Sequence, residues 1–146
     1  MNNMGGYRSV ELLFTDEIET FSVSGDMVNL VRTNDGVRRL LPMHDEGVSL
    51  SASPNFEEGG CVWSHSARIQ LISAKISDQL DRELQTLHRR GCVLVGTTTN
   101  GQTKVYGSKE YPLRGTYHEL DGSRRSDLHR HEMELSCRCL HPALLA

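Results

Sequence analysis

The residues best suited to metal chemistry in this 146-residue chain are two pairs near its C-terminal end, His129-x-His131 and Cys137-x-Cys139. Alternate residues of a β-strand share one face, so a strand over this stretch puts all four side chains on the same side. On a straight strand, however, His129 and Cys137 are about 26 Å apart, whereas zinc ligands lie about 2.0–2.3 Å from the metal. One metal could use one pair together with residues from elsewhere, but not all four. Because binary patterning alone explains each position, we expect these residues to be structural and expect no metal or cofactor.

A second candidate for chemistry is His65, which stands between Trp63 and Ala67 in an alternating stretch. A histidine there could act as a general base, but Ser64-His65-Ser66 lacks the glycines of a nucleophile elbow. The GxSxG, HExxH, P-loop and GxGxxG motifs do not occur in the sequence. We therefore predict that His65 is a core or edge histidine with satisfied hydrogen bonds and that the protein is not an enzyme.

Basic side chains gather just before the last predicted strand, at Arg124, Arg125 and Arg130. Together with Arg138 they could contact phosphate, which makes a small β-rich nucleic-acid-binding module the alternative function. The whole chain opposes that function, because 16 Lys+Arg against 19 Asp+Glu give a net charge of −3. Only eight aromatic residues (three Phe, four Tyr and one Trp) are present for stacking on bases. We therefore predict that nucleic acid is not a partner.

Acidic pairs occur in the polar segment 43–60, at Asp45-Glu46 and Glu57-Glu58. General acid–base catalysis needs two carboxyl groups in opposing environments, whereas these groups lie in a loop-like stretch that we expect to face solvent. We retain no catalytic, cofactor-binding or metal-binding residue. The candidate interaction residues are charged side chains of both signs: Arg124, Arg125, Arg130, Glu57 and Glu58.

The four cysteines, at positions 61, 92, 137 and 139, include no CxxC pair and are too sparse for a disulfide-stapled fold. The N-terminus has neither the basic start nor the apolar stretch of a signal peptide. No run of about 18 apolar residues is present, so we expect no membrane partner. Reduced, mostly buried thiols in a cytoplasmic chain are the expected state.

Hydrophobic alternation and turn residues divide the chain into short β-strands around one helix. The two clearest strands, 61–72 and about 128–140, alternate between an apolar and a polar face along their length. The hairpin turns are Asn34-Asp35-Gly36 and Asn100-Gly101. We place the remaining strands at 9–14, 20–23, 27–33, 37–41, 92–95, 102–106 and 113–120, with 48–52 as a short strand inside the otherwise loop-like segment 43–60.

One helix is predicted, from Ser77 to about Arg90. Its apolar stripe is formed by residues spaced four, four and three apart: Ile76, Leu80, Leu84 and Leu87. Ser77 is the expected N-cap, and Gly91 is the expected residue just past the helix end. We expect the stripe to be buried.

The order of several strands, one helix and several more strands, joined by short antiparallel connections, predicts an α+β domain. Its predicted architecture is an antiparallel β-sheet or small β-sandwich with one flanking α-helix. A parallel nucleotide-binding sheet needs repeated strand–helix alternation, which this order does not have. Since we find neither a repeat nor a Pro-rich linker, we predict a single domain over residues 1–146.

Three stretches carry a resemblance to a known group of proteins: the opening MNNMGGY (1–7), the centre with IQLI (69–72) and RRGCVLV (89–95), and the tail with VYGSKEYPL (105–113) and His141-Pro142. In this order, over nearly the whole chain, they resemble small prophage-encoded, tail-associated structural proteins of gut Bacteroidetes. The resemblance implies a non-enzymatic virion structural or assembly protein and carries over no catalytic residue.

The same resemblance implies that the chain forms a homo-oligomer or ring and that its other partners are phage structural proteins. It also implies a location in the host bacterial cytoplasm during assembly and then in the virion. A ring needs a head-to-tail interface that closes on itself. The acidic segment 43–60 and the Arg124-Arg125 segment are the expected complementary contacts between neighbouring subunits.

Overall fold

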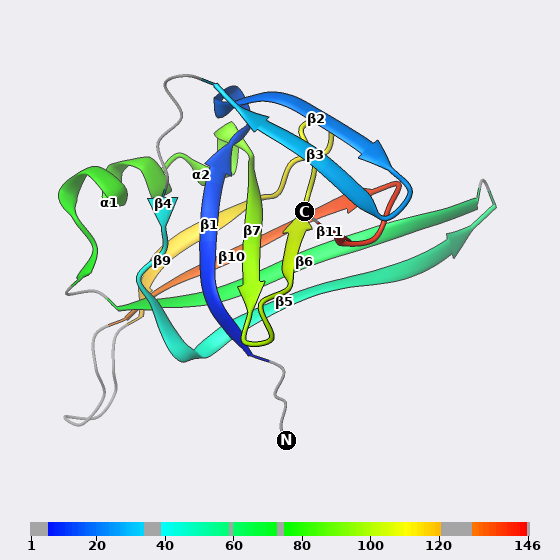
Figure 1. Cartoon of the computed structure of the whole chain (residues 1–146). Coiled ribbons are helices and arrows are strands. Elements are labelled where there is room, and N and C mark those ends of the chain that lie inside the picture. The colour runs from blue at the N-terminus through cyan, green and yellow to red at the C-terminus, as the bar shows by residue number, and fades with distance from the viewer. Residues whose placement is uncertain (1–5, 34–38, 59, 73–74, 121–129, 146) are drawn as a thin grey trace.

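The computed structural model describes residues 6–33, 39–58, 60–72, 75–120 and 130–145. Two β-sheets make up most of it, and Figure 1 shows the strands of one sheet crossing those of the other steeply. The predicted β-rich fold with antiparallel pairing is confirmed. The exception among the described strands is a single parallel pair, between Leu145 and Met27.

The first sheet, sheet A, contains seven strands. Their bounds are Tyr7–Phe14 (β1), Ile18–Ser24 (β2), Met27–Arg32 (β3), Arg39–Leu40 (β4), Cys92–Thr98 (β7), Thr103–Tyr106 (β8) and Leu144–Leu145 (β11). Their order across the sheet is β2-β3-β11-β8-β7-β1-β4. A short 3-10 helix, Thr15–Glu17 (η1), connects β1 to β2. The β7–β8 hairpin turns at the predicted Asn100-Gly101, where Gly101 has the positive φ of 83° that glycine tolerates.

The second sheet, sheet B, contains four antiparallel strands. Their bounds are Met43–Glu57 (β5), Gly60–Ile72 (β6), Arg114–Leu120 (β9) and Arg130–Cys139 (β10). The order is β5-β6-β10-β9, so β6 and β10 lie at the centre. These are the two strands with the clearest alternation, and Ile69 and Met133 on their apolar faces are fully buried.

The main hydrophobic core lies between the two sheets. Leu12 and Leu94 of sheet A meet Ile69 and Met133 of sheet B in one buried cluster. A smaller cluster lies on the other face of sheet A, where alternate residues of β1 and β7 point away from sheet B and meet residues of β2, β3, β8 and β11. Its members are Leu13, Ile18, Val28, Val93, Val105 and Leu144. The β2–β3 hairpin that covers this face is the upper pair of blue strands in Figure 1.

Two short helices, Asp78–Leu84 (α1) and Leu87–Arg90 (α2), replace the single predicted helix. Ser77 caps α1 as expected, because its hydroxyl accepts a hydrogen bond from the Leu80 backbone N–H at 3.1 Å. The helical segment is interrupted after Leu84. There the Thr86 hydroxyl donates a hydrogen bond to the Glu83 carbonyl at 2.6 Å, and this carbonyl leaves the α-helical hydrogen-bond pattern.

The predicted burial of the helical stripe is confirmed for Leu84 and Leu87, which are 0% and 1% exposed, whereas Leu80 is half-buried. Gly91 follows α2 with a φ of 69°. A Cβ atom there would lie 2.8 Å from Cγ of Pro112, so both the backbone angle and the packing require glycine.

The largest departure from the predicted elements is the segment 43–60. It forms the 15-residue strand β5 rather than a loop with a short strand at 48–52. Polar composition and Pro54 made the segment look like a loop. Both are tolerated because β5 lies at the edge of sheet B, where one side of its backbone needs no neighbour.

Two other strand predictions differ in extent. Of the predicted strand 37–41, the described part is β4, and it pairs with β1 rather than with the strand that precedes it. The predicted turn Asn34-Asp35-Gly36 lies outside the described residues. The short strand β11 at the C-terminal end was not predicted, since Pro142 was read as the end of regular structure.

Candidate functional site

The charged residues proposed as partner contacts lie at opposite ends of sheet B. Glu57 is the last residue of β5, and Glu58, which is exposed, follows it at the turn into β6. Arg130 is the first residue of β10, at the other end of the sheet. Arg124 and Arg125 lie outside the described residues. The acids and Arg130 therefore do not form one site within a single chain.

The alternative nucleic-acid surface is also spread out. Arg138 is exposed on β10, eight residues after Arg130, which corresponds to about 26 Å along a strand. Phosphate-binding arginines on one short contact surface lie closer together than this. The described part of the chain therefore does not bring these two arginines together.

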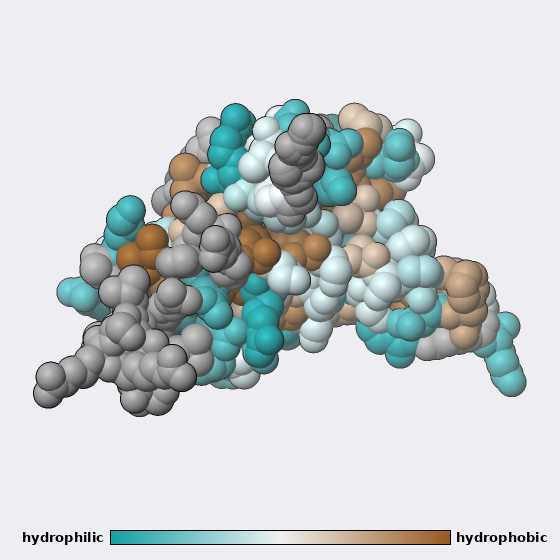
Figure 2. Space-filling view, turned by 90° about the horizontal axis from the view of Figure 1, so that it is seen from below, coloured by the Kyte–Doolittle hydropathy of each residue, from teal (hydrophilic) through white to brown (hydrophobic). Residues whose placement is uncertain are grey.

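Strands β5 and β6 continue past the rest of sheet B as a two-stranded ribbon. The last residue of β10, Cys139, pairs with Trp63, so none of the other described strands lies beside the hairpin tip (residues 55–58 and 60–62). Figure 1 shows this ribbon extending away from the body, and Figure 2 shows the same projection from below. Phe56 in the hairpin tip is 84% exposed, the highest value among the large apolar side chains described.

The alternation of β5 explains why an aromatic ring is exposed there. Leu50 and Ala52 point toward the core and are half-buried, and Phe56 continues this apolar face beyond the point where the body ends. The serines between them face outward, and Ser51 and Ser66 share a hydrogen bond of 2.7 Å across the strands. The sequence analysis missed Phe56, although continuing the period-two alternation through Pro54 would have found it.

A cavity of about 300 Å³ opens on the surface beside the end of β10. It is lined by apolar side chains with a few polar groups: Phe21, Val23, Ser108, Lys109, Glu110, Tyr111, Leu140 and His141. Three of the apolar residues are well exposed, namely Val23 (45%), Tyr111 (44%) and Leu140 (68%). Exposed apolar groups around a hollow are typical of a surface that binds a partner.

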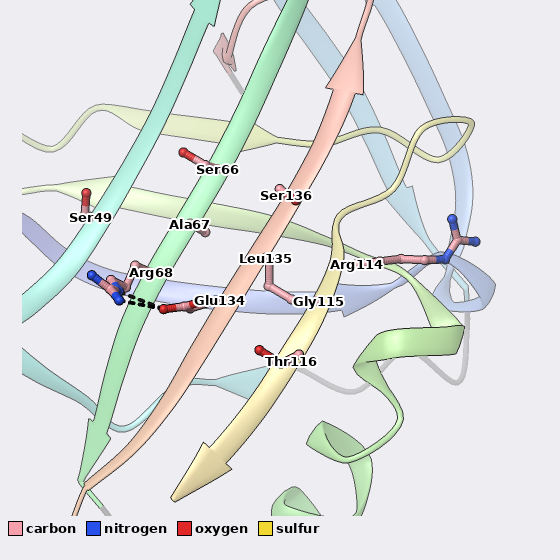
Figure 3. Close-up of a pocket in the computed structure, with 10 residues that line it drawn as sticks. All are labelled: Ser49, Ser66, Ala67, Arg68, Arg114, Gly115, Thr116, Glu134, Leu135 and Ser136. Atoms are coloured by element: carbon pink, nitrogen blue, oxygen red, sulfur yellow. Dashed lines mark hydrogen bonds and ion pairs between the residues drawn. The ribbon is translucent and has the colours of Figure 1, made fainter. Parts of the chain in front are cut away.

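A second, polar hollow of about 480 Å³ lies on the outer face of sheet B, as Figure 3 shows. Three serines from neighbouring strands, Ser49, Ser66 and Ser136, line it. Its Arg68 and Glu134 neutralise each other through a bond of 2.6 Å, which raises the pKa of Arg68. Arg68 and Glu134 therefore compensate each other's charge within the sheet face, and Arg114 is the remaining charged residue of the lining.

His65 is fully buried on the inner face of β6. Its Nε2 lies 2.8 Å from the His141 carbonyl, to which it donates, and its Nδ1 accepts the Gly107 N–H at 2.9 Å. Burial lowers the pKa of His65, so the ring is neutral. The prediction of a core histidine with satisfied hydrogen bonds is confirmed, and backbone groups rather than side chains hold it.

The cysteines of β10 come next to this histidine. The Sγ atoms of Cys137 and Cys139 are 3.5 Å apart, and His65, Cys137 and Cys139 each place a donor atom within 4.8 Å of the others. The hydrogen bond from Cys137 lowers the pKa of Cys139; burial opposes this effect, and a hydrogen bond from Ser108 adds to it. These three residues are the ones in the described chain that could hold a metal.

The histidine pair considered with these cysteines lies elsewhere. His131 stacks on the ring of Tyr117 at 5.2 Å, toward the other end of β10, and His129 lies outside the described residues. All four cysteines are free thiols in the structure, and their reduced state in solution stays a prediction. Cys92 and Cys139 are buried, whereas Cys61 and Cys137 are half-buried.

Comparisons with known proteins do not identify a family for this chain. No family model, curated protein or solved structure matches the chain. None of the described helices has the length and apolar character needed to cross a membrane. The resemblance to prophage tail-associated proteins therefore stays a prediction.

Proposed function

We propose that this chain is a non-enzymatic structural or assembly protein of a phage or prophage virion, associated with the tail, and that it acts by binding copies of itself. In this proposal the chain is a small β-sandwich flanked by one helical segment. The observation that carries it is the hairpin tip, a ribbon end that extends beyond the core of its own subunit and exposes the aromatic ring of Phe56.

An exposed aromatic side chain at the end of a ribbon is suited to binding another molecule. A two-stranded ribbon is only marginally stable in water, so a partner that covers Phe56 would also hold the ribbon in place. Burying a phenylalanine removes about 150–250 Å² from water. A stable interface needs at least about 1,000 Å² in total, so Phe56 is the anchor of a larger contact that includes the sides of the ribbon.

The cavity beside β10 is the receiving surface in this proposal. Its volume of about 300 Å³ accommodates an aromatic side chain, and Tyr111 and Leu140 at its rim supply apolar contacts. Lys109 in the same lining is an opposite charge for Glu58 of an incoming hairpin tip, although Glu110 also lines the cavity. The hairpin tip and the cavity lie at different places on one chain, so each copy has two different contact surfaces.

Two different contact surfaces on one chain produce a head-to-tail assembly, which closes as a ring when the rotation between copies allows it. Other phage structural proteins would then contact the faces of the ring, first in the host cytoplasm and then in the virion.

The proposal is tested by deleting the gene from an inducible prophage and restoring it as the wild type, as Phe56→Ser or as Leu40→Ser. Leu40 is the matched control, because it is also a well-exposed apolar side chain (62%) but lies in β4. We expect the wild type and Leu40→Ser to restore intact tails by electron microscopy. Phe56→Ser should accumulate as folded protein and leave tails unassembled.

Two results would contradict the proposal. Intact tails in the deletion strain would show that the virion does not need this chain. Full restoration by Phe56→Ser, equal to that by Leu40→Ser, would remove the hairpin tip from the assembly interface.

A further inference from the structure

A buried cluster on the inner face of sheet B has the donor atoms of a metal site. His65 of β6 pairs directly with Cys137 of β10, and Cys139 lies two residues further along the same strand. Side chains directly opposite each other in antiparallel strands have Cβ atoms about 4.5–5.5 Å apart, and residues two apart share a face. Backbone pairing at the centre of the sheet therefore fixes the positions of all three side chains.

The distances match those of a zinc centre closely. With zinc–sulfur bonds of about 2.3 Å in a tetrahedral site, two sulfur ligands lie about 3.8 Å apart. The Sγ atoms of Cys137 and Cys139 are 3.5 Å apart, and a donor atom of His65 lies within 4.8 Å of both. Small side-chain rotations would bring the three donors to one ion.

We propose that His65, Cys137 and Cys139 bind one Zn²⁺ ion, with a fourth position for water or another small ligand. Two thiolates and an imidazole are soft and borderline ligands that favour zinc over magnesium or calcium, which prefer oxygen. The set of two cysteines and one histidine leaves one coordination position open. On binding, each thiol releases its proton to solvent, and the two thiolates balance the charge of the ion.

The surroundings of the cluster support a bound ion. Nε2 donates to the His141 carbonyl and Nδ1 accepts the Gly107 N–H, so zinc would bind at Nδ1 in place of the Gly107 N–H while the bond from Nε2 to His141 keeps the ring oriented. Backbone carbonyls commonly play this supporting role for zinc-bound histidines. The Ser108 hydroxyl hydrogen-bonds to Cys139, and such a donor stabilises a thiolate.

The cavity beside β10 provides a route to the cluster. Ser108, Tyr111 and His141 line this cavity, and each of them also contacts the cluster: Ser108 and Tyr111 hydrogen-bond to Cys139, and His141 to His65. An ion entering from solvent would therefore reach the thiols through residues that already surround them. The sequence predicted that Cys137 and Cys139 are purely structural. The structure changes that interpretation, because it places His65 of a different strand beside the two thiols as a third ligand.

The test is a titration of reduced, chelator-treated protein with Zn²⁺ in competition with a chromophoric chelator. We expect one zinc ion per chain and protection of two of the four cysteines from a thiol reagent. Cys137→Ser and Cys139→Ser should each weaken zinc binding by more than the roughly 10–100-fold seen on losing an outer-shell partner. Cys61→Ser is the matched control, because Cys61 is a half-buried cysteine in the hairpin tip, and it should bind zinc like the wild type.

A second measurement uses the wild type alone, because replacing the fully buried His65 would disturb the fold as well as the metal site. Co²⁺ added to the wild type should produce thiolate-to-metal charge-transfer absorption that Zn²⁺ then displaces. The proposal is overturned if zinc binds below one ion per chain and leaves the reactivity of Cys137 and Cys139 unchanged, or if Cys61→Ser loses as much affinity as Cys137→Ser. This inference is independent of the virion role, because the purified chain alone decides it.

Discussion

Arg39 joins three elements through one guanidinium group, and its removal is the sharpest test of how the body is held together. Its Nη1 and Nη2 donate to the two carboxylate oxygens of Glu17 at 2.5 and 2.8 Å, and its Nε donates to Glu83 at 2.7 Å. The Arg39 side chain is only 8% exposed. Burial opposes its charge, but the hydrogen bonds and charges of the two glutamates outweigh that effect and raise its pKa.

Replacing Arg39 by alanine leaves Glu17 and Glu83 without their shared cation in a largely buried position. Breaking a buried ion pair in this way costs about 3–5 kcal/mol of unfolding free energy. For a domain of this size each kilocalorie corresponds to roughly 2–4 °C in Tm, so we expect a decrease of roughly 6–20 °C. Glu17 keeps one partner, because it also accepts the Phe14 N–H at 3.0 Å.

Chemical denaturation followed by circular dichroism measures this loss. Asp16→Ala is the control, because the Asp16 side chain is 67% exposed and its ion pair with Arg90 lies at the surface, so it should lose far less stability. Adding Glu83→Gln to Arg39→Ala should recover part of the loss, since it removes one unpaired charge. A loss under about 1 kcal/mol for Arg39→Ala would refute the reasoning, because it is the value of an exposed pair.

Four further substitutions test the packing and burial. Leu84→Ala should cost about 2–5 kcal/mol of unfolding free energy, because Leu84 is fully buried. Leu80→Ala should cost less, because Leu80 is only half-buried. Equal losses would contradict the orientation of the helix. Gly91→Ala should cost more than about 1 kcal/mol, since its Cβ would meet Pro112 at a φ of 69°. Burial raises the pKa of Cys92 from 9.0 to about 12, so the unfolded chain loses this proton at lower pH than the folded one. The difference in unfolding free energy between the wild type and Cys92→Ala should therefore be constant below about pH 9 and decrease as the pH rises toward 12.

The parts of the fold that the sequence predicts are those decided by local pattern. The alternation of residues 61–72 and the Asn100-Gly101 turn each depend on neighbours a few positions away, and both are confirmed. The helix was predicted in the right place but too long, because the Thr86 hydroxyl breaks it at a residue that periodicity alone does not mark. Strand β5 was missed because an edge strand tolerates the polar residues and proline that otherwise indicate a loop.

The parts that the sequence does not predict depend on the register between distant strands. His65 and Cys137 meet because β6 pairs with β10 in one particular alignment, and a shift of one residue would put them on opposite faces. Local pattern placed each residue on an apolar face but did not say which residue faced which. Likewise, Phe56 becomes exposed only because β10 ends before the hairpin does.

The most direct test of the proposed virion role is to induce prophages in the strain that encodes this chain and to analyse the purified virions and their assembly intermediates by quantitative mass spectrometry. The account predicts that the chain is present in several copies per particle, in a fixed ratio to the tail proteins, as a ring would require. Absence of the chain from both the virions and the intermediates would contradict it.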